Sequence, residues 1–388
     1  MSAGDAMDAL IGWDVGGAHV KASLLLREPA GFALRDVAQW PCPLWQGLEP
    51  LRRVLEAAHA RWPQAAGAEH AVTMTGEMVD LFADREAGVA TIAATLDAAL
   101  DGPVWLFVGG AGAATPPRAR SGATAAAVFG WCPAADAAAH WPRIASANWL
   151  ATAALAAEGA GDGLLIDVGS TTSDLIPLRA GRVAVHGRDD AARLASGELV
   201  YHGVVRTPLC ALGPRVAFRG EAVNLMNELF ATSADVYRLT GELDPAHDQH
   251  PPADGGGKDA AATRQRLARM IGRDARDAAE VDWHGFAEAL RAAQLAELRH
   301  NALRVVERAA LPANAPLVAA GCGDFLVRRL AEALGRPCLD FADLALAGAA
   351  AEPTLARWAQ VAAPSVAVAL LRARASADAG AGGLPTKA

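Results

Sequence analysis

One stretch of the sequence combines a carboxylate with a turn that is rich in hydrogen-bond donors. Residues 164–177 read LLIDVGSTTSDLIP, in which one apolar run ends at Asp167 and a second begins after the turn. The flanking runs consist of strand-forming residues and glycine permits a tight turn, so the pattern predicts a β-hairpin. The turn is made of Gly169, Ser170, Thr171 and Thr172.

The chemistry that this turn favours is anion binding. Backbone N–H groups and hydroxyls that converge on one concave turn suit a phosphate, and a neighbouring carboxylate suits the water shell of Mg²⁺. The alternative is an ordinary Gly-Ser-Thr turn that Asp167 merely caps. A short pattern does not decide between these interpretations.

The same pattern occurs near the start of the chain. The segment LIGWDVGGAHVK places Asp14 after an apolar run, with Gly16 and Gly17 in the turn. Two similar halves that hold one polyphosphate across a cleft would need such a duplicated strand, carboxylate and turn. We therefore expect Asp14 and Asp167 to bind Mg²⁺ and the two turns to bind one polyphosphate.

A third glycine-rich turn and several longer motifs give the chain a family resemblance. Residues 318–324, VAAGCGD, together with the two hairpins resemble the phosphate and nucleotide motifs of the actin, sugar kinase and Hsp70-like superfamily. More closely, the chain looks like the short hydantoinase/oxoprolinase-related proteins of tetrahydromethanopterin-linked one-carbon metabolism. The motifs that carry this closer resemblance are TMTGEM (73–78), SANW (146–149), IDVGSTTSDLIPL (166–178), SGELVYHGVVRTPL (196–209), ELFATSADVYRLTG (228–241) and ADGGGK (253–258).

The resemblance implies an α/β protein with a two-domain actin-like ATPase fold, a duplicated ribonuclease H-like domain with an interdomain cleft. The first domain would span residues 8–158 and carry the first hairpin. The second would span residues 159–375 and carry the second hairpin, an inserted loop at 244–258 and the glycine-rich turn. A loose tail would follow at 376–388.

The resemblance also implies a reaction. Archaeal members are similar to a synthase that joins a furan-methyl diphosphate to the phenol of glutamyl-tyramine and releases diphosphate during methanofuran assembly. The chain would then be a transferase of the EC 2.5.1 type in methanofuran or methylofuran synthesis. The superfamily fold leaves an ATP-dependent kinase or amidohydrolase open, although Ala18 and His19 stand where many kinases carry a hydroxyl residue. A non-catalytic nucleotide-binding assembly protein is the third interpretation.

Further residues are candidates for catalysis and binding. Glu77 or Glu198 would be the general base that takes the phenol proton, and the sequence does not choose between them; Glu77 equally suits the first turn of a helix. Arg206 would assist catalysis by binding diphosphate with its guanidinium, or form a surface salt bridge. The diphosphate-binding candidates are Gly16, Gly17, Lys21, Gly169, Ser170, Thr171, Thr172 and Lys258, and the substrate-binding candidates are Asn148, Thr232, Asp235, Gly321 and Gly323.

The segment 244–258, DPAHDQHPPADGGGK, is rich in proline, glycine and charge. We expect no regular element there. Its Gly-Gly-Gly-Lys end would allow backbone amides and one ammonium group to close over an anion, so we favour a lid over a disordered insert.

Composition excludes several classes of partner. The net charge of −8 provides no basic surplus for nucleic acid and argues against a membrane-surface role. The longest nearly apolar stretch, 144–157, is shorter than the roughly 18 residues of a membrane-spanning helix, and MSAGDAMD at the start lacks the basic region of a secretory signal. Five scattered cysteines predict neither disulfides nor a zinc site. We expect a cytoplasmic protein that uses small molecules and Mg²⁺; the oligomeric state stays open.

Hydrophobic periodicity predicts the other elements. Helices are expected at 48–61, from 75 onward, at 145–157, within 221–238, and at 262–271, 283–311 and 365–374. Strands are expected at 22–26, 32–40, 71–75, 104–109 and 317–320.

Overall fold

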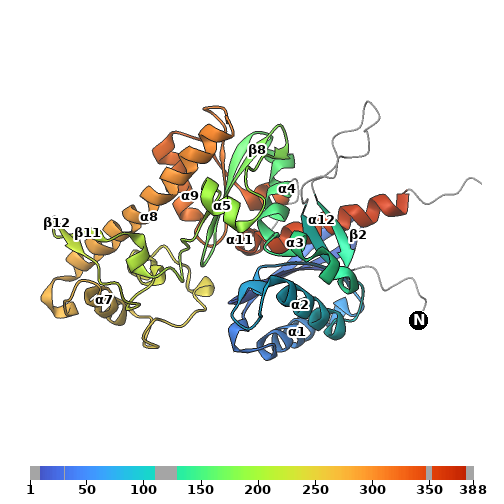
Figure 1. The fold of residues 1–388 in the computed structure, drawn as a ribbon, viewed down its shortest axis with the longest axis horizontal. Coiled ribbons are helices and arrows are strands. Elements are labelled where there is room, and N and C mark those ends of the chain that lie inside the picture. Colours follow the sequence, from blue (N-terminus) through green and yellow to red (C-terminus); the bar gives the residue numbers. More distant parts are fainter. Residues whose placement is uncertain (1–8, 30, 110–128, 347–351, 382–388) are drawn as a thin grey trace, which may run out of the picture. The chain divides into compact units, whose positions relative to one another are not determined.

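The structure is a computed structural model that describes residues 9–29, 31–109, 129–346 and 352–381. The chain divides into two compact units, residues 1–159 with 342–388, and residues 160–341. Each unit is an α/β structure built on its own β-sheet (Figure 1).

The sheet of the first unit has six strands in the order β3-β2-β1-β4-β5-β6. The first three strands form an antiparallel meander, and β4 and β5 then add in parallel. All seven residues of β1 are buried, which agrees with a central strand whose two faces are both covered. The strands are β1 (Ala9–Val15), β2 (His19–Glu28), β3 (Gly31–Pro41), β4 (Glu69–Met74), β5 (Val104–Gly109) and β6 (Phe129–Pro133).

Helices cover both faces of this sheet. Trp13 faces the core that includes α1 and α2. The preceding residue, Gly12, points to the other face of the sheet, where α12 lies. A Cβ atom at Gly12 would lie only 2.1 Å from the Ser365 carbonyl oxygen, so glycine is required for this close approach. The helices of this unit are α1 (Glu49–Arg61), α2 (Arg85–Ala99), α3 (Ala137–Ile144), α4 (Asn148–Ala160), α10 (Phe341–Ala345), α11 (Pro353–Val361) and α12 (Ala363–Ala381).

The C-terminal segment therefore completes the first unit, in contrast to the predicted domain boundaries. Residues 342–375 were assigned to the second domain, but α12 packs on β1, β2 and β4. The hydroxyls of Ser23 and Ser365 form a hydrogen bond of 2.6 Å in this interface. The predicted loose tail at 376–388 is likewise helical as far as Ala381; residues 382–388 and the N-terminal MSAGDAMD lie outside the described residues.

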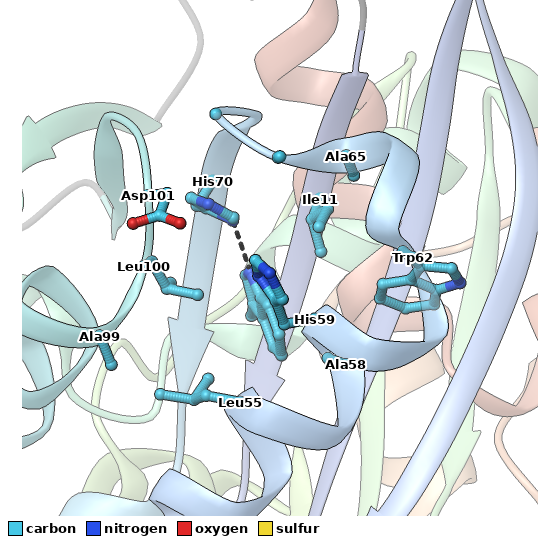
Figure 2. A pocket seen from close by; sticks show the side chains of 13 residues that line it. Ile11, Leu55, Ala58, His59, Trp62, Ala65, His70, Ala99, Leu100 and Asp101 are labelled. Atoms are coloured by element: carbon cyan, nitrogen blue, oxygen red, sulfur yellow. Dashed lines mark hydrogen bonds between the residues drawn. The ribbon is translucent and has the colours of Figure 1, made fainter.

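A small cavity lies in the first unit beside α1 (Figure 2). Its volume is ≈ 30 Å³, which is room for about one water molecule. His70 of β4 points into it near Asp101, and its Nδ1 accepts a hydrogen bond from Trp13 Nε1 at 3.1 Å. Burial lowers the pKa of His70 to about 4, so the imidazole is neutral at pH 7. A cavity of this size belongs to the core and holds no substrate.

The second unit repeats the topology of the first. Its sheet has the order β10-β8-β7-β13-β14, with β9 also on β8. β7 pairs with β8 antiparallel as β1 does with β2, and β13 and β14 add in parallel as β4 and β5 do. This repetition confirms the predicted α/β class and its duplicated, actin-like topology. The strands are β7 (Gly163–Val168), β8 (Ser173–Arg179), β9 (Arg182–Val183), β10 (Leu199–Val200), β13 (Leu317–Ala320) and β14 (Cys338–Asp340).

The remaining elements of the second unit lie mostly between β10 and β13. The long helix α8 supports a two-stranded sheet, where Phe218 packs against Trp283 and Phe286 with ring centroids 5.0 and 5.6 Å apart. The elements are α5 (Asp190–Ser196), β11 (Arg215–Phe218), β12 (Glu221–Asn224), α6 (Ser233–Leu239), α7 (Ala260–Arg269), α8 (Glu280–Arg308) and α9 (Asp324–Leu334).

Three predicted elements differ in the structure. The helix expected from residue 75 is only a short 3₁₀ turn, Gly76–Met78, and α2 begins later at Arg85. The segment expected to be helical from 221 begins as strand β12, because a tight turn at Arg219 and Gly220 forms a hairpin. The loop 244–258, expected to lack regular structure, contains a short 3₁₀ helix at Pro245–His247.

No single helix within the described residues is long and apolar enough to cross a membrane. The pair α11 and α12 reaches the necessary length and composition together, but the two helices meet at 98°. Buried residues of both helices pack within the first unit.

Candidate functional site

The second hairpin closes around a four-residue turn at the end of β7. The Gly169 N–H donates to the Thr172 carbonyl at 2.8 Å, and Asp167 stands opposite Asp174 on β8. Asp167 is 8% exposed and the turn residues are half-buried. The predicted hairpin is therefore confirmed, with Ser170 and its neighbouring hydroxyl residues in the turn.

The backbone of residues 203–206 lies against this turn. The Val204 N–H donates to the Gly169 carbonyl at 3.0 Å. The Val205 and Arg206 N–H groups both donate to the Ser170 carbonyl, at 3.1 and 2.8 Å. These bonds fix the shape of the turn without any contribution from side chains.

Two side-chain features of this contact bear on anion binding. A Cβ atom at Gly203 would lie 2.4 Å from both Ser170 C and Thr171 N, so only glycine allows the two backbones to meet. Arg206 Nη1 lies 3.4 Å from Thr171 Oγ1, to which it donates. Burial lowers the pKa of Arg206, yet a guanidinium keeps its charge at neutral pH. A permanent cation thus stands at the tip of the turn.

The glycine-rich turn packs on the other side of Asp167. β13 runs parallel to β7 and brings Ala320 beside Asp167. Gly321 has φ +84°, and a Cβ atom there would lie 2.4 Å from Asp167 Oδ1. The Gly323 N–H donates to the Val168 carbonyl at 2.9 Å. The structure therefore gathers three predicted segments around one carboxylate.

The loop 244–258 is tied to the second unit by ion pairs. Arg238 donates to both carboxylate oxygens of Asp248, at 2.6 and 2.8 Å. Lys258 Nζ donates to the Asp248 carbonyl oxygen and lies 3.2 Å from its Oδ1. Burial raises the pKa of Asp248, but the hydrogen bonds from these two cations outweigh it and hold the pKa low.

His250 links this loop to Arg206 electrostatically. The pKa of His250 is lowered first by burial and then by the positive charges of Arg206 and Lys258. Both cations therefore act on one half-buried imidazole. Lys258 is a predicted diphosphate ligand. It acts on the same imidazole as Arg206, and Arg206 in turn donates to Thr171 in the hydroxyl-rich turn.

Thr232 and Asp235, two predicted substrate ligands, have contacts within the fold. They form a reciprocal capping box at the start of α6. The carboxylate of Asp235 is fully buried and accepts from Arg238 Nη1 and Arg266 Nε, both at 2.9 Å. The two guanidinium groups pair with the buried carboxylate of Asp235 within the fold.

Glu198, one of the two predicted bases, is also held by structural hydrogen bonds. Its carboxylate accepts from the N–H groups of His186 and Gly187 at 2.6 and 2.7 Å, and from Ser196 Oγ at 2.7 Å. The residue is 2% exposed. Three hydrogen bonds to one buried carboxylate fit a residue that fixes a turn.

The first hairpin has its own close contacts. A Cβ atom at Gly16 would lie 2.8 Å from the His19 carbonyl oxygen, and one at Gly17 would lie 2.7 Å from Val79 Cγ1. Asp14 is 7% exposed and stands opposite Lys21 on β2. Lys21 Nζ donates to the Val361 carbonyl at 3.1 Å.

Glu77 lies in the first unit, next to this hairpin. The Thr75 N–H donates to the Val15 carbonyl at 3.0 Å, which places the 3₁₀ turn carrying Glu77 beside Gly16. Ser146 Oγ donates to Glu77 Oε1 at 2.8 Å. Asn148, a predicted substrate ligand, begins α4 and accepts from the next N–H in the chain at 2.8 Å.

Three residues of these sites were absent from the sequence-based candidates. Gly203 and Ser146 both lie inside motifs that carry the family resemblance, so their motifs were a signal although their contacts were not visible. His250 lies in the loop that the sequence predicts to be a lid, but only Lys258 and the glycines beside it were singled out there. Their importance depends on neighbours that are distant in the sequence.

A magnesium ion that is partly ligated by phosphate needs few ligands from the protein. Within the described ranges, no group of three or more His, Cys, Asp and Glu side chains is arranged to hold a metal. Mg²⁺ typically takes one or two carboxylates and completes its shell with water and substrate phosphate. Asp14 in the first unit and Asp167 in the second are each a carboxylate of this kind beside a hairpin turn, and a Cβ atom at position 321 would lie 2.4 Å from Asp167 Oδ1.

Comparisons with known proteins agree with the sequence motifs. A curated protein of Methanocaldococcus jannaschii named (4-{4-[2-(gamma-L-glutamylamino)ethyl]phenoxymethyl}furan-2-yl)methanamine synthase is 27% identical over 300 residues, covering 77% of this chain and 82% of that protein. A protein of Methanococcus vannielii with the same name is 31% identical over 108 residues, covering 28% of this chain and 48% of that protein. Among solved structures, the activator of the 2-hydroxyisocaproyl-CoA dehydratase from Clostridium difficile with bound ADPNP has a TM-score of 0.43 at 10% identity, covering 98% of this chain and 100% of that chain.

A match to a family model gives the family assignment. The model described as hydantoinase/oxoprolinase matches residues 128–360. That range is more than half of the chain and includes the second hairpin, the residues that pack on it and the glycine-rich turn. The chain belongs to the hydantoinase/oxoprolinase family.

Proposed function

We propose that the protein is a transferase that joins a furan-methyl diphosphate to the phenol of glutamyl-tyramine in methanofuran or methylofuran synthesis. The observation that carries the proposal is the similarity to the M. jannaschii synthase over 77% of the chain. The name of that synthase describes a phenoxymethyl furan, which is an aryl ether between a phenol and a furan-methyl group. The family resemblance adds tetrahydromethanopterin-linked one-carbon metabolism as the setting.

The proposed reaction is a substitution at the furan methylene. The bond between the methylene carbon and the diphosphate oxygen breaks, and its electron pair leaves with diphosphate. The phenol oxygen forms the new bond to the methylene, and its proton passes to a base. Ionisation is favourable because the furan ring stabilises positive charge on the methylene, so the main task is to stabilise the leaving diphosphate.

The second hairpin supplies the groups that this task needs. Backbone N–H groups and hydroxyls of the turn would bind the diphosphate oxygens, and Arg206 would neutralise charge as it develops on the leaving group. Lys258 and Lys21 would add further positive charge. Mg²⁺, held by Asp14 and Asp167, would supply additional charge neutralisation on the diphosphate. The proposal thus requires both hairpins to contribute to one substrate.

Glu77 is the better-supported base of the two candidates. Glu198 already accepts three hydrogen bonds that fix a turn, whereas Glu77 lies beside the first hairpin with Ser146 as its donor. A phenol becomes much more acidic as its oxygen bonds to carbon, so the base needs position more than an unusual pKa.

The direct test combines purified protein, the furan diphosphate, glutamyl-tyramine and Mg²⁺, with and without ATP. Mass spectrometry should detect the aryl ether and released diphosphate without ATP. ATP hydrolysis or phosphoryl transfer without ether would support the kinase or amidohydrolase alternative. Tight nucleotide binding without turnover or ether would support an assembly protein.

A further inference from the structure

The buried carboxylate of Glu77 has a hydroxyl donor that is 69 residues away in the sequence. Ser146 Oγ donates to Glu77 Oε1 at 2.8 Å. Glu77 is 1% exposed and Ser146 is 9% exposed. A carboxylate buried to this degree depends on its hydrogen-bond donors, because water does not solvate it. Ser146 is therefore one of the groups that hold this carboxylate in place.

The backbone of Glu77 is fixed from two sides. A Cβ atom at Gly76 would lie 3.1 Å from the Val15 carbonyl oxygen of the first hairpin. On the other side, a Cβ atom at Gly88 would lie 2.6 Å from the Glu77 carbonyl oxygen. The packing leaves rotation of the side chain as the main remaining freedom of Glu77, and the bond to Ser146 restricts that rotation.

Ser146 adopts a backbone conformation that serine rarely takes. Its φ is +51°, and it lies in the connection between α3 and α4. Among the described residues, three other non-glycine residues have positive φ: Ala180, Arg219 and Ala310. Those three are exposed, whereas Ser146 is buried. Strain of this kind at a buried position is typical of functional sites, where it orients a particular group.

We propose that Ser146 is a positioning residue for Glu77. The inference rests on the proposed function, in which the Glu77 carboxylate accepts the phenol proton while the phenol oxygen bonds to the methylene and diphosphate leaves with its electron pair. Ser146 fixes the rotamer of Glu77 so that the carboxylate meets the phenol. Its hydroxyl acts through Glu77 and not on the substrate itself.

The test compares Ser146→Gly with a matched control, Ala180→Gly. Glycine removes the hydroxyl and suits a positive φ, so the fold of Ser146→Gly should be retained. Ala180→Gly makes the same backbone change at an exposed turn. We expect Ser146→Gly to lower kcat for ether formation by about 10- to 100-fold with KM for the diphosphate within about twofold. Ala180→Gly should keep wild-type kinetics.

A double variant separates orientation from general structure. In a Glu77→Gln background, Ser146→Gly should cause no further loss of kcat, because both changes remove the same function. Two results would overturn the proposal: wild-type kcat in Ser146→Gly, or a further 10- to 100-fold loss, about the single-variant factor, on top of Glu77→Gln.

An infrared measurement keeps this inference separate from the proposed function. The difference spectrum of wild-type protein minus Glu77→Gln, recorded without substrate, contains the carboxylate stretch of Glu77. Losing the Ser146 hydrogen bond should shift that band in Ser146→Gly, and an unshifted band would contradict the inference. If wild-type protein makes no ether, the proposed function fails, while the band still decides whether Ser146 orients Glu77.

Discussion

The two Asp-Val-Gly hairpins share one backbone design but differ in what surrounds their carboxylates. In the first, Asp14 stands opposite Lys21 and the turn carries no hydroxyl at Gly16 or Gly17. In the second, Asp167 stands opposite Asp174 and the turn carries hydroxyls on three consecutive residues. A second carboxylate, that of Glu77, lies beside the first hairpin, whereas the cation of Arg206 lies beside the second.

The two hairpins share their strand pairing but not the residues around their turns. Asp174 is paired with the buried guanidinium of Arg193 at 2.6 Å, and the cation at the tip of the second turn is Arg206. The first turn has a proton acceptor beside it instead. We infer that the second hairpin mainly binds diphosphate and the first mainly serves proton transfer.

The largest expected effect is the loss of turnover in Asp167→Asn. The amide preserves the shape of the carboxylate but removes the charge that Mg²⁺ requires, so ether formation should fall by at least about 100-fold. The unfolding temperature should change by less than about 4 °C, since the amide keeps the shape of the carboxylate. Kinetics and calorimetry on the same preparation measure both.

The matched variant at the first hairpin is Asp14→Asn. Lys21 stands opposite Asp14 and keeps its positive charge in this variant. We therefore expect Asp14→Asn to lose less turnover than Asp167→Asn. A parallel collapse of stability and activity in Asp167→Asn would instead identify Asp167 as a structural cap of its hairpin, which is the alternative that the sequence left open.

A second prediction concerns the backbone contact at the second turn. Gly203→Ala would bring a Cβ atom within 2.4 Å of Ser170 and Thr171 backbone atoms, so the turn must move. We expect diphosphate binding, measured by calorimetry, to weaken by about 10-fold or more. Gly285→Ala, in α8 with no atom near the new Cβ, is the control and should bind normally. Equal binding by both variants would show that the shape of the turn is irrelevant.

A third prediction concerns the loop and Lys258. If the loop acts as a lid, Lys258→Met should raise the ratio of hydrolysed furan-methanol to ether by about 3- to 10-fold, because water reaches the methylene cation more easily. Arg276→Met, whose side chain is 85% exposed, is the control. An unchanged product ratio at undiminished rate would leave Lys258 as an anchor for Asp248 and remove it from the site.

The smallest expected effect concerns the core of the first unit and the dependence of stability on pH. Burial lowers the pKa of His70 to about 4, so the unfolded chain binds a proton near pH 6.5 that the folded protein does not bind. Stability is therefore full above pH 6.5 and falls as the pH drops toward 4. Between pH 7 and 5.5 the loss should be about 1 kcal/mol.

Urea unfolding at several pH values measures this effect. His70→Gln should flatten the pH dependence, because glutamine keeps an acceptor for Trp13 without a titrating group. His59→Gln, on the exposed side of the same cavity, should leave it unchanged. A wild-type slope in His70→Gln would assign the pH dependence to other groups.

Local patterns were sufficient to predict the hairpins and most strands. The hairpins at the two Asp-Val-Gly segments form for local reasons, since glycine permits the turn and β-branched residues favour the strands. The hairpin at 215–224 was missed because Arg219 supplies a positive φ, which sequence patterns assign to glycine or asparagine. The helix expected at 75 was wrong because Val79 leaves the 3₁₀ turn in an extended conformation.

The parts that could not be predicted depend on contacts between distant residues. The return of α12 to the first unit depends on a glycine at position 12 that admits a helix more than 350 residues later. The roles of Asp235 and Glu198 likewise depend on donors brought to them by the fold, such as Arg266 and His186. Residue types alone indicated carboxylates and turns, but not which carboxylates already accept hydrogen bonds within the fold.

An isotope experiment tests the central claim most directly. Glutamyl-tyramine labelled with ¹⁸O in its phenol is incubated with the protein, the furan diphosphate and Mg²⁺. Mass spectrometry then measures the masses of the products. The account predicts that the ether keeps the label and that the released diphosphate contains none, because the phenol oxygen attacks the methylene. Label in a phosphate product, or an absolute requirement for ATP, would contradict it.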